Sequence, residues 1–143
     1  MALERLFKDG DELRAVIRGH LYLERCLVLL IIRQLPESEQ QSVLRSHFPE
    51  KIDRAIALGV LPRDERELLR SINRIRNRFA HEPRAYLPEV DAMAIGATLS
   101  LRVRERLANA GRNGPEDFDL PLDFLKVVIV AMCYILIEDC RKS

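Results

Sequence analysis

A chain of 143 residues with 48% apolar and 31% charged side chains is long enough to bury a core, which excludes a disordered or fibrous protein. The formal net charge of +1 excludes binding to nucleic acid or to an anionic membrane through overall charge, so such binding requires local clusters of charge. The three cysteines form no Cys-x-x-Cys pair, which indicates reduced thiols in a cytoplasmic protein rather than a disulfide framework.

Apolar residues recur at helical spacing along nearly the whole chain, and patterns typical of strands are almost absent. Prolines stand at the expected starts of several helices, and Gly59 and Pro83 stand where helices should end. The chain is therefore predicted to be one all-α domain, residues 1–143, that forms a helical bundle of five to six helices. The expected helices span residues 11–34, 37–46, 49–59, 62–82, 88–111 and 120–140.

The sequence predicts no membrane, cofactor or metal partner. Its most apolar segment, residues 124–137, is too short to cross a hydrocarbon core and contains Lys126, so we expect a buried helix there. The N-terminal residues lack the uninterrupted apolar stretch of a signal peptide. There is no glycine-rich phosphate loop, and no histidine or cysteine pair has the spacing of metal ligands.

Two ionisable side chains interrupt the apolar face of the first expected helix. His20 and Glu24 lie one turn apart at the centre of the arc that carries its apolar residues. Burying them without partners would cost several kcal/mol, so they need a mutual hydrogen bond, a partner from another helix or a water-filled cleft. They are either a satisfied structural pair or part of a polar site. An ion pair between Glu24 and Arg76 is the simplest arrangement that satisfies both charges.

Four arginines lie four residues apart in the helix expected over residues 62–82, and no acid occurs between residues 68 and 81. Like charges at this spacing weaken an isolated helix by a few tenths of a kcal/mol per pair. Either acids of neighbouring elements, such as Glu37, Glu39 or Asp64, neutralise the row, or the row binds phosphate groups. In the second interpretation Arg70, Arg74 and Arg78 are the nucleic-acid contacts, with Arg66 at the start of the same row.

His81 stands at the end of the same helix, beside the bend expected at Pro83. A histidine that exchanges protons, next to arginines that hold a phosphate, is the minimum set for cleaving RNA without metal. The base takes the proton of the ribose 2′-hydroxyl, and the cations stabilise the negative charge that develops on the phosphate. The alternative is that His81 only caps the helix or lies on the surface.

The sequence "RNRFAH", which is Arg76-Asn77-x-x-x-His81, resembles the Arg-x4-His signature of the HEPN superfamily. Residues 52–81 are similar to the MltR (mannitol operon repressor-like) branch, which also has an "LGV" turn one helix before the signature. The resemblance implies a bacterial helical bundle that forms a homodimer with two signatures in one cleft. It implies a metal-independent ribonuclease of a toxin, defence or regulatory system, with a possible antitoxin as protein partner. Arg76 and His81 would be catalytic, and Asn77, Glu24 and His20 would support them.

Two other functions stay open, and they leave undecided whether the chain is an enzyme. One is a transcriptional regulator of the MltR type that acts through a protein partner. Direct DNA reading is disfavoured because Glu65 stands where a helix-turn-helix over residues 55–69 would need an apolar residue. The other is a non-catalytic protein-interaction module, in which Arg76 and His81 tie helices together.

Overall fold

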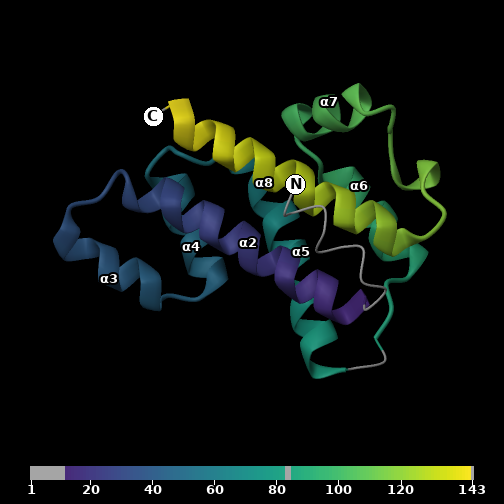
Figure 1. Ribbon diagram of the computed structural model, residues 1–143, viewed down its shortest axis with the longest axis horizontal. Coiled ribbons are helices and arrows are strands. Elements are labelled where there is room, and N and C mark those ends of the chain that lie inside the picture. Colours follow the sequence, from purple (N-terminus) through teal and green to yellow (C-terminus); the bar gives the residue numbers. More distant parts are fainter. Residues whose placement is uncertain (1–11, 83–84, 143) are drawn as a thin grey trace.

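The computed structural model describes residues 12–82 and 85–142, and its regular structure there consists of helices only (Figure 1). The all-α prediction is confirmed, with seven α-helices and two 3₁₀ turns in this part of the chain. The α-helices are α2 (Glu12–Ile32), α3 (Glu37–Arg45), α4 (Phe48–Ala57), α5 (Arg66–His81), α6 (Glu89–Thr98), α7 (Leu101–Asn109) and α8 (Pro121–Lys142). The 3₁₀ turns are η1 (Arg63–Glu65) and η2 (Pro115–Asp117).

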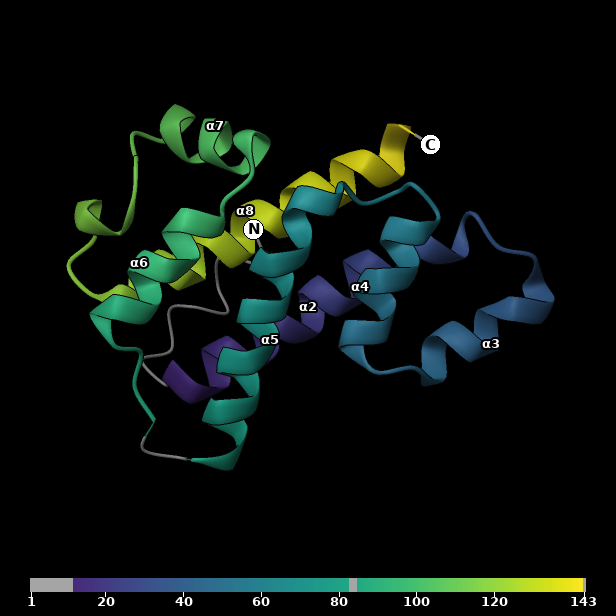
Figure 2. The same cartoon turned by 180° about the vertical axis from the view of Figure 1, so that it is seen from behind.

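The two longest helices, α2 and α8, lie side by side and run in the same direction (Figures 1 and 2). On the other side of α2, α4 and α5 pack against it and against each other. The helices α6 and α7 cover α8, while α3 projects beside the C-terminal end of α2 (Figure 2). The core therefore surrounds α2, and polar side chains on α2 lie between α4 and α5.

The apolar residues of α5 form one stripe, and that stripe is buried. Leu68, Ile72, Ile75 and Phe79 recur at spacings of four, three and four residues, and each is at most 6% exposed. Burying side chains of this size stabilises the fold by roughly 1.5–3 kcal/mol each, before the entropy cost of ordering them. The same packing fixes which face of α5 turns outward, and that face carries the arginines.

One predicted helix is wrong, because residues 88–111 form two helices rather than one. The backbone is extended at Leu99 and Ser100, with ψ angles of 131° and 164°, so α6 ends and α7 begins there. The Ser100 hydroxyl donates a hydrogen bond of 2.8 Å to the Glu65 carboxylate instead of facing solvent. This long-range contact holds the break, and the resulting seven α-helices exceed the predicted five to six.

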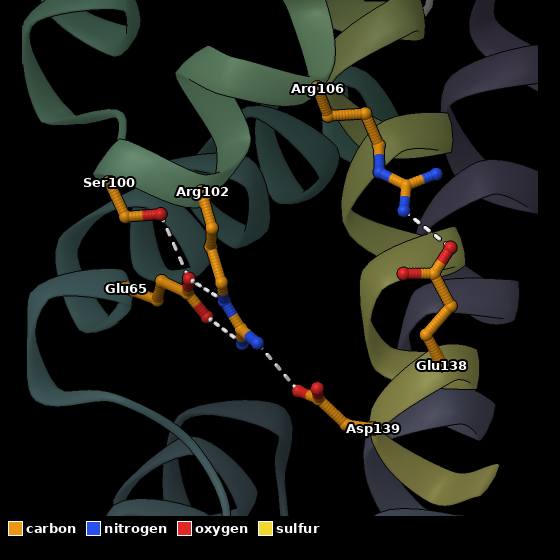
Figure 3. A network of polar contacts seen from close by, with 6 residues as sticks. All are labelled: Glu65, Ser100, Arg102, Arg106, Glu138 and Asp139. Carbon is orange, nitrogen blue, oxygen red and sulfur yellow. Dashed lines mark hydrogen bonds and ion pairs between the residues drawn. The ribbon is translucent and has the colours of Figure 1, made fainter. Parts of the chain in front are cut away.

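Glu65 is fully buried at the end of η1 and lies at the centre of a polar network (Figure 3). The Arg102 guanidinium donates to both of its carboxylate oxygens, from Nε at 2.5 Å and from Nη2 at 2.6 Å. Arg102 Nη1 also donates to Asp139 of α8 at 2.8 Å. The hydrogen bonds with Glu65 raise the pKa of Arg102, so this cation stays charged. The network joins the start of α5 to α7 and to the end of α8.

We predict that Glu65→Ala lowers the free energy of unfolding by about 3–5 kcal/mol, because it leaves the Arg102 charge without its principal partner. Urea unfolding followed by circular dichroism measures this difference. The matched control is Glu67→Ala, two residues away, which removes an exposed ion pair with Arg74. The control should cost about 1 kcal/mol or less. Equal losses in the two variants would contradict the assignment.

Candidate functional site

A cleft of about 560 Å³ opens between α2, the segment that leads into α4, and the middle of α5. Apolar walls come from Ile17 and Leu21 of α2 and from Phe48 and Pro49 at the start of α4. Seven polar side chains also line it, namely His20, Glu24, Ser46, His47, Asn73, Arg76 and Asn77. The structure thus brings together four of the predicted site residues, which are His20, Glu24, Arg76 and Asn77.

His20 is held in a defined position although it lies on the buried face of α2. It is 5% exposed, and its Nε2–H donates a 3.1 Å hydrogen bond to Asn73 Oδ1 of α5. Its ring packs against Phe48, with ring centres 4.5 Å apart. Burial lowers the pKa of His20, and the Arg76 charge lowers it further, while Glu24 and the Asn73 hydrogen bond act against them. His20 is therefore neutral near pH 7.

Glu24 pairs with Lys51 of α4. The ion pair between Glu24 and Arg76 that the sequence analysis gave as the simplest arrangement is not formed. The distance from Glu24 Oε2 to Lys51 Nζ is 3.3 Å, and the Lys51 side chain is only 5% exposed. Lys51 Nζ also donates to the carbonyl oxygen of Ser46, so two acceptors share this ammonium group. Lys51 lies beside Ile52 and one turn before Ala55, at the edge of the apolar face of α4. Lys51 was not identified from the sequence, although its place next to the apolar face of this helix could have indicated that it is buried.

Arg76 extends into the cleft without a carboxylate partner among the residues that the structure describes. Its Nη1 donates a 3.0 Å hydrogen bond to Asn77 Oδ1 on the same helix. Its Nε is buried and has no hydrogen-bond partner within the described ranges, which is also true of Nε in Arg66 and Arg78. A guanidinium without a carboxylate partner in the described ranges, in a hollow that also holds amide side chains, is suited to bind an anion that presents two oxygens to it, such as a phosphate or a carboxylate.

Each arginine of the row on the outer face of α5 has a carboxylate partner, but the acids are not the ones expected. Asp53 of α4 lies 3.4 Å from Arg66 and 3.1 Å from Arg70. The remaining pairs are Arg74 with Glu67 at 2.9 Å and Arg78 with Asp91 at 3.0 Å. None of Glu37, Glu39 or Asp64 takes part in these pairs. An RNA phosphate at Arg70, Arg74 or Arg78 would have to compete with a carboxylate that is already bound.

His81 lies outside the cleft, as the last residue of α5, and its side chain is exposed. Five residues along a regular helix turn a side chain by about 140° from its starting direction. Arg76 and His81 of one chain therefore do not share this cleft, because α5 stays helical through the whole motif.

Comparisons of the chain with protein-family models, with curated proteins and with solved structures find no match. In the described ranges, no group of three or more histidine, cysteine, aspartate or glutamate side chains could hold a metal ion. None of the helices described is long and apolar enough to cross a membrane. The three cysteines are all free thiols, with Cys26 and Cys133 buried and Cys140 partly buried.

We predict that Lys51→Ala lowers the free energy of unfolding by about 1–3 kcal/mol, because the Glu24 carboxylate and the Ser46 carbonyl both lose their donor. Arg76→Ala is the matched comparison in the same cleft. It should change stability by less than about 1 kcal/mol, because no carboxylate is left unpaired. Chemical denaturation measures both values, and the reverse order would show that Arg76 holds a structural ion pair.

We also predict that His20 makes stability depend on pH. The folded-state pKa lies below the unfolded value of about 6.5, so the unfolded chain binds more protons and stability falls as the pH drops through this range. His20→Gln cannot take up a proton and lacks this loss. The stability of the wild type relative to His20→Gln should therefore decrease between about pH 8 and about pH 5. Thermal melts of the two proteins in matched buffers measure the change, and a constant difference would contradict the assignment.

Proposed function

We propose that the chain is a HEPN-like helical domain that binds RNA, with a phosphate group of the RNA held by Arg76 in the cleft. The observation that supports this most directly is which arginines between residues 66 and 78 form ion pairs with carboxylates. Four of them are paired with carboxylates, and Arg76 is the one without such a partner among the described residues. A free guanidinium next to amide donors recognises the shape and charge of a phosphate.

The sequence resemblance supports the same residue. Arg76 is the arginine of the Arg-x4-His signature, and Asn77, which follows it, accepts a hydrogen bond from Arg76 and also lines the cleft. Glu24 and His20, the supporting residues that the resemblance implies, line the same cleft. A cytoplasmic location and a homodimer belong to this proposal as well.

RNA cleavage requires more than one chain in this proposal, because His81 lies outside the cleft of its own chain. In a homodimer, the His81 side chain of one protomer would face a phosphate held by Arg76 of the other. His81 would take the proton of the 2′-hydroxyl as a general base, and the 2′-oxygen would attack phosphorus. The 5′-oxygen would leave with a proton from water. Arg76 would stabilise the negative charge on the phosphate oxygens during this step.

A regulator that acts through a protein partner is the second candidate, and the position of Glu65 favours it over direct DNA reading. Glu65 is buried in the network with Arg102, and one face of the following helix α5 is buried in the core. A recognition helix needs a free face that enters a DNA groove. The outer face of α5 carries arginines that are already paired with acids.

We predict that a fluorescently labelled single-stranded RNA binds the wild type in EDTA at low salt, and that Arg76→Ala weakens binding by about tenfold. The matched control is the double variant Arg74→Ala, Arg78→Ala, whose arginines are engaged by Glu67 and Asp91. Although it removes two charges, this control should weaken binding less than Arg76→Ala. Fluorescence anisotropy measures all three affinities. A wild type that does not bind RNA would overturn the proposal and favour a protein-interaction module.

For cleavage, we predict that the wild type cuts the same RNA in EDTA and that His81→Ala does not. Mixing His81→Ala with Arg76→Ala should restore part of the cutting, because a mixed dimer contains one complete pair of Arg76 and His81. Gel electrophoresis of the labelled RNA reads out the result. Binding without cleavage in the wild type would remove the catalytic role of His81 and leave the binding role of Arg76 intact.

A further inference from the structure

A second hollow of about 430 Å³ lies next to the cleft, between α2 and α3, and we call it the α2–α3 groove. Its walls are Val28, Leu29 and Ile32 of α2 and Leu44 of α3. Leu29 of α2 is 54% exposed and Leu44 of α3 is 52% exposed, so two large apolar side chains from different helices lie at the surface of the groove. Exposed leucines that line one groove are typical of a surface that binds an apolar partner.

The charges at the rim of the α2–α3 groove are not balanced. Glu24 and Lys51 lie at one end and form an ion pair with each other. Arg25, which also lines the groove, is exposed and has no carboxylate partner in the part of the chain that the structure describes. An occupant that buries the leucines therefore gains from a carboxylate placed beside Arg25.

The wall of the groove that α2 forms is about as long as two turns of a helix. Leu29 and Ile32 are three residues apart on α2, and Arg25 lies one turn before Leu29. Two turns of helix rise by about 11 Å, so a bound helix with apolar residues at positions i, i+4 and i+7 would cover the groove from Arg25 to Ile32. The apolar side chains of such a helix would lie between Leu29 and Leu44.

We propose that the α2–α3 groove binds an amphipathic helix of a partner protein, with apolar residues on one face and a carboxylate at the edge of that face beside Arg25. A second copy of this chain is the main rival occupant, because α6 carries exposed Val90, Met93 and the acid Glu89. However, α3 and α6 lie at opposite ends of the molecule (Figure 1). Such a head-to-tail contact would propagate into an open filament unless its rotation closes a ring, so we favour a separate partner.

The groove and the cleft share a boundary, because Glu24 lines both hollows. A helix in the α2–α3 groove would contact the Glu24–Lys51 ion pair at the edge of the cleft. The partner would therefore alter access to Arg76. The docking proposal does not depend on RNA binding, since no groove residue other than Glu24 lines the cleft.

The test uses two synthetic 16-residue peptides with leucines at positions i, i+4, i+7 and i+11, one flanked by glutamates and one by lysines. Each peptide is titrated into isotope-labelled full-length protein. The glutamate peptide should shift the NMR signals of Val28, Leu29, Ile32 and Leu44. Its dissociation constant should be lower than that of the lysine peptide by about fivefold or more. The double variant Leu29→Ser, Leu44→Ser should lose the binding, and Leu120→Ser should keep it, because Leu120 is 57% exposed elsewhere.

The remaining variants separate the rival explanations. Arg25→Gln should remove the preference for the glutamate peptide, and Arg76→Ala should leave binding to the peptide unchanged even if it abolishes RNA binding. Absence of binding by either peptide up to about 1 mM would overturn the proposal. Analytical sedimentation could also overturn the proposal. It would do so if the wild type self-associates while two double variants, Leu29→Ser, Leu44→Ser on the one hand and Val90→Ser, Met93→Ser on the other, are both monomeric. That result would assign the groove to a second copy.

Discussion

The buried ion pair between Glu65 and Arg102 is the constraint on which much of this fold depends. A carboxylate that is fully buried must be given hydrogen bonds, and Glu65 receives them from Arg102 and Ser100. To provide the Ser100 bond, the chain leaves helical geometry between α6 and α7. To provide the Arg102 bonds, α7 has to lie over the start of α5, and the end of α8 follows because Asp139 binds the same guanidinium (Figure 3). One buried charge therefore positions three segments that are far apart in sequence.

The cleft also depends on polar side chains that need partners, in this case two on the apolar face of α2. His20 and Glu24 interrupt the apolar face of α2, and each finds a partner on a different helix, Asn73 on α5 and Lys51 on α4. Because Lys51 pairs with Glu24, the Arg76 guanidinium is left in the cleft without a carboxylate partner among the described residues. The polar residues of α2 and the proposed phosphate site on α5 are therefore linked through this ion pair. Phe48 contributes to the same arrangement by packing against the His20 ring.

The two hollows divide the surface of α2 into a cationic part and an apolar part. In the part of the chain that the structure describes, the cleft contains one guanidinium without a carboxylate partner, whereas the α2–α3 groove contains leucines with one arginine at the rim. Phosphate recognition and helix docking therefore need different residues, apart from the shared Glu24. In both interpretations, RNA-binding domain and partner-dependent regulator, the outer face of α5 is a paired and largely neutral surface rather than the binding stripe that its arginines alone indicate.

By itself, the sequence determined the helical class, most helix positions and the buried face of α5, because these depend on the spacing of apolar residues and on proline and glycine at the ends. It also identified His20 and Glu24 as buried polar groups in need of partners. Only the tertiary structure decided which partners they have and that the acids of the arginine row are Asp53, Glu67 and Asp91. It also decided that His81 lies outside the cleft that Arg76 lines. Periodicity reports which residues share one face of one helix. An ion pair between helices depends on how those helices are placed in space, and that placement is set by the packing of the whole core.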